Sequence, residues 1–285
     1  MRRKLARLPA PAKLNLMLRI VGRRPDGYHL LQTVFQFIDR CDWVTLRVRG
    51  DSEIRLTNPL PGVSEQQDLT VRAARLLQQK TGCAEGVDIT VEKILPMGGG
   101  LGGGSSDAAT VLAGLNRLWG CHVAAADLSA LGLSLGADVP IFLYGRSAWG
   151  EGVGEHLTPL DLAEPWYVVI MPPCQVSTAQ IFNSEGLTRN NEPITIESFI
   201  AGRHENHCLR VVTQRYPVIE DAVAALGRVS EEPRLTGTGA CVFAAFEDAD
   251  RARTAVELLR PEWDCFLARG CNRSPLLDAL ETTIS

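Results

Sequence analysis

The chain has 285 residues, of which 45% are hydrophobic and 22% are charged, and its formal net charge is −4. These values are typical of a water-soluble globular protein that forms one large or two ordinary domains around a substantial core. The negative net charge and the lack of a long run of Lys and Arg argue against a nucleic-acid partner.

Membrane insertion and secretion are not expected. The longest uncharged stretch, residues 165–184, contains prolines and many polar residues, so it is too broken to cross a bilayer. Pro9, Pro11 and Lys13 stand where a secretory signal would have its apolar core. The eight cysteines show no C-x-x-C spacing, and we expect reduced, mostly buried thiols. These features predict a cytoplasmic protein.

Three segments in the first half alternate apolar and polar residues, as half-covered strands do. They are Ala12–Ile20, Trp43–Arg49 and Val87–Glu92. In the first segment the apolar residues share one face, whereas Lys13, Asn15 and Arg19 share the other, so we expect only one side to be covered. Such strands belong to antiparallel or mixed sheets.

Apolar residues at helical spacing predict three helices in the same half, each ending near a glycine. They are Leu69–Lys80, Ser106–Trp119 and a shorter helix that Asp127 caps and that runs to Leu135. After about residue 150 the pattern restarts. The elements expected there are a strand at Tyr167–Met171, a polar loop at Leu187–Pro193, a helix from about Pro217, a glycine-interrupted strand at Leu235–Phe246, a helix at Asp248–Leu259 and a strand near Phe266–Ala268. We predict an α/β (α+β) protein with domains at residues 1–152 and 153–285, roughly the last 15 residues being free to pack back on the first domain.

The segment Pro96–Asp107 is the most informative part of the sequence. Six of the seven residues Gly98–Gly104 are glycine, which costs more conformational entropy than a plain turn requires. The segment lies between a predicted strand and a long predicted helix, whose free N–H groups and dipole favour a bound anion. We interpret it as a loop that brings bare backbone close to phosphate groups, rather than as a flexible linker.

Other phosphate-binding loops match this segment less well. Gly98, Gly100 and Gly103 satisfy the G-x-G-x-x-G pattern of dinucleotide-binding proteins, but the preceding strand alternates and does not begin the fold. No Lys follows the glycines as in a Walker A loop, and the H-R-D and D-F-G motifs of protein kinases are absent. A dehydrogenase therefore remains a weak alternative.

Three segments, in order along the chain, resemble the three signatures of the GHMP kinases. They are Pro11–Leu16, Pro96–Ser106 and Leu235–Cys241. The resemblance implies a GHMP kinase fold, with an amino-terminal ATP-binding domain like ribosomal protein S5 domain 2 and a ferredoxin-like carboxy-terminal substrate domain. It also implies that ATP and Mg²⁺ are used, and it leaves open whether the protein is a monomer or a homodimer.

Three further segments resemble one group within this family. They are Arg24–His29, Leu135–Pro140 and Gly150–Glu155. Members of the group phosphorylate the 2-hydroxyl of a methylerythritol linked to cytidine diphosphate, in the non-mevalonate isoprenoid pathway. The expected partner is thus a small molecule. A GHMP kinase for another alcohol, such as mevalonate or homoserine, and an inactive nucleotide-binding regulator stay as alternatives.

The resemblance also implies roles for single residues. Asp138 would be the general base that takes the proton of the substrate hydroxyl, and Lys13 would keep it ionised and offset developing negative charge. Without the resemblance, Asp138 is a turn or N-cap residue. The residues that would bind the nucleotide are Asp68, Lys93, Pro96, Met97, Gly98, Gly99, Gly100, Leu101, Gly102, Gly103, Gly104, Ser105 and Ser106.

Within that set some roles differ. Asp68 and Lys93 match positions near adenine, although the family more often has Asn where Asp68 stands, and an ionised Asp can only accept hydrogen bonds. Ser105 or Ser106 would either cap the helix or bind Mg²⁺. The carboxylate of Asp107 is expected to point away from the phosphates, which it would repel.

The substrate residues follow from the same resemblance. They are Asn15, Tyr28, His29, Thr178 and Phe182. Tyr28 and Phe182 match the aromatic pair that encloses cytosine, and His29 matches the residue that reads its polar edge. Taken alone, these aromatic residues are ordinary core and strand residues.

Overall fold

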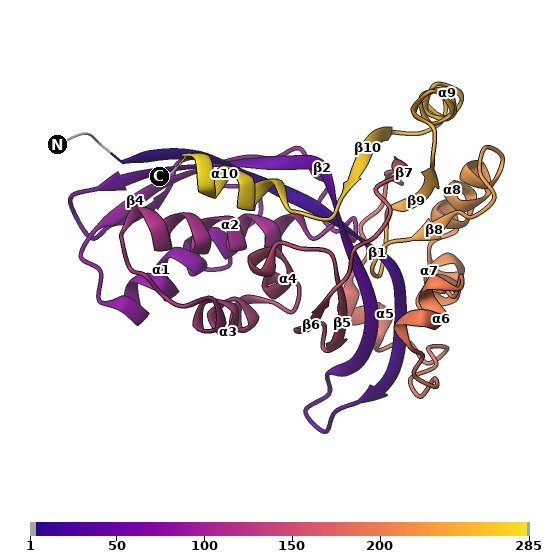
Figure 1. Cartoon of the computed structure of the whole chain (residues 1–285), viewed down its shortest axis with the longest axis horizontal. Coiled ribbons are helices and arrows are strands. Elements are labelled where there is room, and N and C mark those ends of the chain that lie inside the picture. The colour runs from indigo at the N-terminus through magenta and orange to yellow at the C-terminus, as the bar shows by residue number, and fades with distance from the viewer. Residues whose placement is uncertain (1–3, 284–285) are drawn as a thin grey trace.

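A long antiparallel pair of strands is the central element of the fold (Figure 1). The computed structural model describes residues 4–283. In it β1 (Leu5–Arg23) and β2 (His29–Arg49) pair along nearly their whole lengths, with three shifts of register. Among the described strands, only β2 pairs with β1, so β1 is an edge strand. Pro9 and Pro11 are tolerated in it because an edge strand does not need an N–H donor at every residue.

The other strands extend the sheet from β2. They are β3 (Ile54–Leu56), β4 (Gly86–Glu92), β5 (Ala148–Gly152), β6 (His156–Pro159), β7 (Trp166–Ile170), β8 (Arg234–Leu235), β9 (Val242–Phe246) and β10 (Cys265–Cys271). Their order is β3-β4-β2-β10-β7-β9-β8, while β5 pairs with β2 and β6 with β5. Among the described strands, β3 and β4 form the single parallel pair. The predicted antiparallel or mixed sheet is therefore confirmed.

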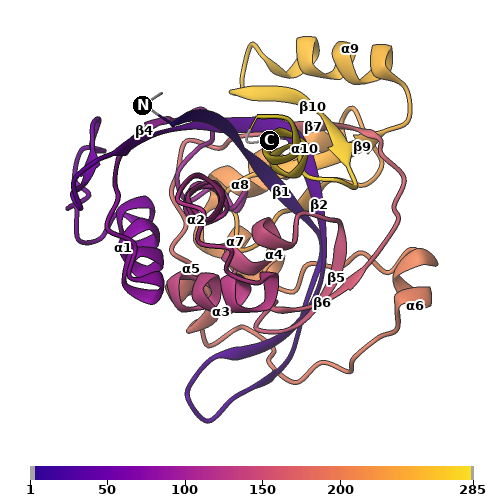
Figure 2. The ribbon, with the colours of Figure 1, turned by 60° about the vertical axis from the view of Figure 1, so that its left-hand side comes forward.

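Helices cover the two ends of this sheet in separate groups. They are α1 (Leu69–Thr81), α2 (Gly103–Leu118), α3 (Ala125–Leu135), α4 (Val139–Tyr144), α5 (Thr178–Phe182), α6 (Ile196–Ile200), α7 (Leu209–Arg215), α8 (Pro217–Gly227), α9 (Ala249–Leu259) and α10 (Pro275–Thr283). Figure 1 shows α1–α4 gathered beside the left part of the sheet and α6–α9 at the right. Figure 2 shows α9 next to β9 and β10, on the far side from α1.

Each group of helices has its own hydrophobic core. The first core lies between α1–α4 and strands β1, β2 and β4, and it includes Leu276 and Leu280 of α10. The second lies between α7–α9 and strands β7–β9. A third cluster joins them, with Leu14 and Met17 of β1 packed near Phe243 of β9. The chain thus crosses between the two halves through β1, β2, β10 and α10.

The prediction that β1 is covered on one side only is wrong. Lys13, Asn15 and Arg19 are 2%, 3% and 5% exposed. The carboxy-terminal half covers this polar face: the Asn15 N–H donates to the Thr236 hydroxyl at 3.0 Å, and Arg19 pairs with Glu205 at 3.2 Å. Because these partners come from distant segments, local alternation does not reveal the burial.

Other boundaries also differ from prediction. The helix expected to begin at Asp127 starts at Ala125, and Asp127 lies in its first turn, where its charge suits the helix dipole. The strand expected at Leu235–Phe246 is two short strands, β8 and β9. Gly237 and Gly239 between them have φ of 57° and 90°, a left-handed backbone that ends strand pairing.

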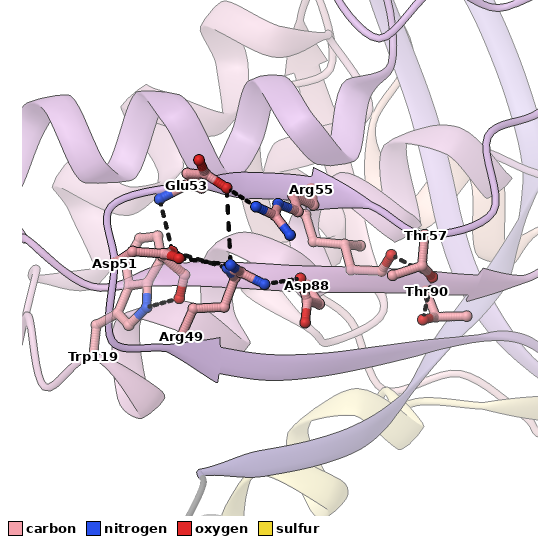
Figure 3. A network of polar contacts seen from close by, with 10 residues as sticks. Arg49, Asp51, Glu53, Arg55, Thr57, Asp88, Thr90 and Trp119 are labelled. Atoms are coloured by element: carbon pink, nitrogen blue, oxygen red, sulfur yellow. Dashed lines mark hydrogen bonds and ion pairs between the residues drawn. The ribbon is translucent and has the colours of Figure 1, made fainter.

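A polar network fixes the turn between β2 and β3 (Figure 3). The Arg49 guanidinium donates to Asp51 at 2.8 Å and to Asp88 of β4 at 2.9 Å. The Asp51 carboxylate in turn accepts from the Glu53 N–H. Nearby, the hydroxyls of Thr57 and Thr90 lie 2.6 Å apart. These contacts hold the three-residue strand β3 in place beside β4.

Candidate active site

The glycine-rich segment and the loop between β8 and β9 pack directly against each other. The Gly98 and Gly99 carbonyls accept from the Ala240 and Cys241 N–H groups at 3.1 and 3.0 Å. Gly100 has φ of 76°, and a Cβ there would lie 2.2 Å from the Thr236 carbonyl oxygen. The glycine at position 100 is therefore required by loop-to-loop packing, a constraint that adds to the predicted contact with phosphate.

The start of α2 is open to an anion. The N-cap residue is Gly102, so no side chain caps the first N–H groups of this 16-residue helix. Gly104 lies in the first turn, and a Cβ added there would meet, within 4 Å, a Leu69 methyl group at 3.7 Å. A phosphate group would find unpaired N–H donors and the positive end of the helix dipole here.

A cavity of about 370 Å³ opens at this helix start. Most residues predicted to bind the nucleotide line it. They are Asp68, Lys93, Pro96, Met97, Gly98, Gly99, Gly100, Gly102, Gly103, Gly104 and Ser105. Two others do not: Leu101 is packed in the third hydrophobic cluster, and Ser106 is fully buried with a hydroxyl that has no partner among the described residues. Both serines lie inside α2, so neither caps it, and only Ser105 faces the cavity.

The ammonium group of Lys93 is held by two buried carboxylates. It pairs with Asp107 at 2.8 Å and with Asp42. Burial raises the pKa of Asp107 and the charge of Asp42 adds to this, while Lys93 opposes it. Burial alone would lower the pKa of Lys93, but the two carboxylates outweigh it and leave the pKa raised. Asp107 is thus bound to Lys93, and Asp42 is a partner that the sequence did not reveal.

Asp68 has a structural function of its own. It is the N-cap of α1, and its carboxylate accepts from the Thr70 and Val71 N–H groups at 2.9 and 3.2 Å. An Asp serves well here because its charge also suits the helix dipole. The side chain still borders the 370 Å³ cavity.

Lys13 and Asp138 meet where the glycine segment ends. The Lys13 Nζ lies 3.4 Å from an Asp138 carboxylate oxygen and donates to the Gly100 carbonyl at 3.0 Å and to the Asn15 side chain. Asp138 occupies the N-cap position of α4, but its side chain makes no capping hydrogen bond. The plain capping interpretation of Asp138 therefore does not hold. Asn15 is itself oriented by a 2.8 Å bond to Thr33.

A second cavity of about 580 Å³ adjoins the first. Every predicted substrate residue lines it. They are Asn15, Tyr28, His29, Thr178 and Phe182. Gly100, Ser105, Asp138 and Thr178 border both cavities, so the two spaces meet at Asp138. The Thr178 hydroxyl also lies 2.9 Å from that of Thr238, which ties α5 to the loop between β8 and β9.

The aromatic end of this cavity also contains a stacked pair that the sequence did not reveal. The ring stacked on Phe182 is that of His29, with centroids 4.8 Å apart and planes at 17°. Tyr28 is 60% exposed. Burial, followed by the charges of Arg189 and Arg23, lowers the pKa of His29.

The residues described in the structure show no group of three or more His, Cys, Asp or Glu side chains placed to hold a metal ion. In the same residues, 4–283, no helix has both the length and the apolar character needed to span a bilayer. All eight cysteines are free thiols, and four of them are buried. The other four are half-buried, so burial is less general than the sequence predicted.

Similarity to known proteins decides the family. Residues 68–146 match the family model of the GHMP kinases N terminal domain. A relative from Methylococcus capsulatus, 4-diphosphocytidyl-2-C-methyl-D-erythritol kinase, is 59% identical over 274 residues, which are 96% of this chain and 94% of that protein. The chain belongs to the 4-diphosphocytidyl-2-C-methyl-D-erythritol kinase family.

Solved structures agree with this assignment. A crystal structure of 4-(cytidine 5'-diphospho)-2C-methyl-D-erythritol kinase is 33% identical, has a TM-score of 0.79, and is matched over 93% of this chain and 98% of that one. Homoserine kinase from Cytophaga hutchinsonii, at 16% identity and a TM-score of 0.67, shares the fold alone over 96% of each chain. The predicted GHMP kinase fold is confirmed.

Three residues of this 4-diphosphocytidyl-2-C-methyl-D-erythritol kinase family member were not found by sequence reasoning. Asp42 pairs with Lys93, Thr33 orients Asn15, and Arg189 contacts His29. Asp42 ends the segment Asp39–Asp42, which has three charged residues inside a long strand and is a weak signal of a buried charge. The other two carry no local signal, because each acts on a residue distant in the chain.

Proposed function

We propose that this protein transfers the γ-phosphoryl group of ATP to the 2-hydroxyl of 4-diphosphocytidyl-2-C-methyl-D-erythritol. The products would be ADP and the 2-phosphate, in the cytoplasm, within non-mevalonate isoprenoid synthesis. One observation carries the proposal: a cavity at an open helix start and a cavity with an aromatic end meet at the Lys13–Asp138 pair. Family membership supports the choice of substrate.

Lys13 and Asp138 fit the needs of phosphoryl transfer. This reaction depends mainly on positioning and on offsetting charge, and a base must accept the proton of the attacking hydroxyl. The Asp138 side chain is 39% exposed and borders both cavities, so a hydroxyl can reach it. The Lys13 ammonium group, 3.4 Å away, offsets negative charge that develops next to this carboxylate during the transfer.

The residues at the start of α2 fit ATP and Mg²⁺. The uncapped N–H groups and Gly104 leave room for phosphate oxygens close to the backbone. Mg²⁺ prefers oxygen ligands and keeps several waters, so the Ser105 hydroxyl and the Asp138 carboxylate are the candidates to hold it together with phosphate. When bound, Mg²⁺ would offset the negative charge of the phosphates.

The aromatic end of the 580 Å³ cavity would bind the nucleotide part of the substrate. A stack on one aromatic side chain is worth about 1–3 kcal/mol and tolerates any base, so selection of cytosine must come from hydrogen bonds. Phe182 offers the stacking surface, and the exposed Tyr28 is free to close on the other side. His29 is the polar group beside them.

Two alternatives are weaker. A kinase for mevalonate or homoserine has no evident use for Tyr28, His29 and Phe182 in its substrate cavity. An inactive nucleotide-binding regulator would have no need of the buried Lys13 held against Asp138. Similarity to homoserine kinase, at 16% identity, extends to the fold alone.

A coupled ADP-release assay tests the proposal. Purified protein, ATP and Mg²⁺ are combined with 4-diphosphocytidyl-2-C-methyl-D-erythritol, free methylerythritol, mevalonate or homoserine. We expect efficient turnover with the first compound alone, and loss of that turnover in Asp138→Asn, which also controls for contaminating kinases. If free methylerythritol had the same kcat/KM as its cytidine diphosphate form, the nucleotide would not contribute to recognition. Turnover of mevalonate or homoserine alone would contradict the proposed substrate.

A further inference from the structure

Arg189 lies behind the aromatic end of the substrate cavity. Its Nε donates to His29 Nε2 at 3.2 Å. The two remaining guanidinium nitrogens donate to backbone carbonyls, one to Leu187 at 3.1 Å and the other to Phe182 at 2.9 Å and Ser184 at 2.6 Å. Arg189 is half-buried and does not line the cavity, whereas His29 and Phe182 do. A single side chain thus holds the two cavity residues whose rings are stacked.

The chemistry of arginine restricts the state of the histidine ring. A guanidinium group donates hydrogen bonds and cannot accept them. The His29 Nε2 that it contacts must therefore carry a lone pair and no proton. The lowered pKa of His29, caused by burial and then by the charges of Arg189 and Arg23, favours the neutral ring. In a neutral ring with a bare Nε2, the proton is on Nδ1.

The other nitrogen is then a hydrogen-bond donor ready for a ligand. Within residues 4–283, His29 Nδ1 has no hydrogen-bond partner. Cytosine carries acceptors at N3 and at its carbonyl oxygen, whereas uracil carries a donor at N3. An N–H group fixed at the cavity wall would pair with cytosine N3 and would oppose the N3–H of uracil.

We propose that Arg189 is a positioning residue that locks His29 in its Nδ1-protonated form and thereby makes the cavity select cytosine over uracil. The inference rests on the proposed function and adds the residue that sets its base specificity. Arg189 also ties the end of α5 to this ring. A five-residue helix has little stability of its own, so the contacts of Arg189 with the Phe182 and Ser184 carbonyls fix where the Phe182 ring lies.

The first test reads the ring directly in the free protein. Nitrogen-15 NMR of histidine-labelled protein distinguishes the two neutral forms, and His29→Gln assigns the signal among the five histidines. We expect Nδ1 to carry the proton in the wild type and a mixture of both forms in Arg189→Met. The control is Arg215→Met, which removes an exposed arginine of α7 that contacts Gln180 of α5 at 3.2 Å. A wild-type ring protonated on Nε2, or a ring unchanged by Arg189→Met, would overturn the proposal.

The second test measures base selection. The kcat/KM values are compared for cytidine diphosphate and uridine diphosphate forms of methylerythritol. In Arg189→Met the ratio of the cytidine value to the uridine value should fall about tenfold, because a buried donor is no longer fixed. The change should appear mainly in KM. Arg215→Met should leave the ratio unchanged. An equal loss for both substrates would mean that Arg189 only supports the loop, and would overturn the specificity role.

The two tests separate this inference from the proposed function. If Arg189→Met does not fold, Arg189→Lys keeps the charge but lacks the planar fork, and we expect it to lower the ratio as well. A lysine variant with wild-type selectivity would contradict the proposal. Failure of the proposed function would be seen differently: the wild type would phosphorylate neither compound, and the ring measurement would still support or contradict the role of Arg189.

Discussion

The buried ammonium of Lys13 lies 3.4 Å from the half-exposed carboxylate of Asp138. The lysine side chain is 3% exposed and is anchored by the Gly100 carbonyl and by Asn15, so the position of its charge is fixed by the protein. Asp138 has the cavity on its open side. This arrangement suits a base that must reach a mobile substrate hydroxyl on one side while a fixed positive charge lies on its other side.

Asp138→Asn should lose activity through turnover. General-base contributions are typically about 10²–10⁴-fold, so kcat should fall by at least that order while KM for either substrate changes little. Lys13→Met should also lower kcat severely. If the two residues act as a unit, the double variant should lose much less activity than the two single losses combined would predict. Steady-state kinetics of the three variants, with thermal unfolding to confirm folding, check this.

Asp127→Asn is the matched control for that series. Asp127 is an exposed acid in the first turn of α3, outside both cavities, so its variant should keep wild-type kcat. Turnover close to that of the wild type in Asp138→Asn would reduce Asp138 to a structural residue.

Gly104 and Gly100 should respond differently to substitution. Gly104→Ala leaves the packing intact and replaces a helical glycine, so the protein should unfold at an equal or higher temperature, yet bind ATP more weakly because the methyl group occupies phosphate space. Gly100→Ala forces a methyl group against the Thr236 carbonyl and should destabilise the protein. Isothermal titration and thermal unfolding separate the effects. Unchanged ATP affinity in Gly104→Ala would contradict the phosphate assignment.

Phe182→Ala should weaken the substrate without stopping the reaction. Loss of one stacking surface is worth about 1–3 kcal/mol, so KM for the cytidine substrate should rise roughly 5- to 150-fold. His29→Ala should raise KM too, and should also narrow the preference for cytidine over uridine, which Phe182→Ala should leave in place. Because remote binding also orients the hydroxyl, a smaller fall in kcat is expected. Identical selectivity in both variants would argue against base reading by His29.

The lowered pKa of His29 predicts an acid limit to substrate affinity. Above the ordinary histidine value of 6.5 the ring is neutral, so KM for the cytidine substrate should be flat. As pH falls through the lowered pKa, the ring gains a proton on Nε2 and faces the Arg189 donor, so KM should rise. Folding stability should depend on pH in the same direction. Because His29 in the unfolded chain has the higher pKa and takes up the proton first, the free energy of unfolding falls as pH drops below 6.5. His29→Gln should remove the acid rise in KM.

Lys93→Met should destabilise the protein strongly. The substitution leaves the carboxylates of Asp42 and Asp107 buried without their cation, a change that typically costs about 3–5 kcal/mol. Chemical denaturation measures the loss, and Lys93→Met combined with Asp107→Asn should recover part of it by removing one stranded charge. A stable Lys93→Met protein would show that the charged group is not structural and would favour a direct role with adenine.

Particular residues show how far the sequence reaches. The glycine segment predicts a phosphate-binding loop because its demands are local: a bare backbone and a helix start lie next to each other in the chain. A further constraint on Gly100 comes from Thr236 on another loop, which the sequence does not reveal. Tyr28 and Phe182 were predicted to enclose cytosine between them. The stacking of His29 on Phe182, with Arg189 in contact with both residues, was not evident from the sequence.

The sequence by itself determined the order of the signature segments and the antiparallel or mixed character of the sheet, because both are expressed in residue types at short spacing. The choice of Lys13 and Asp138 followed from the family resemblance that the signature segments carry. The tertiary structure alone decided that the polar face of β1 is buried, that Asp42 and Asp107 share Lys93, and that Arg189 faces His29. These contacts form when segments far apart in the chain pack together, and a buried polar group takes its role from whichever partner that packing supplies.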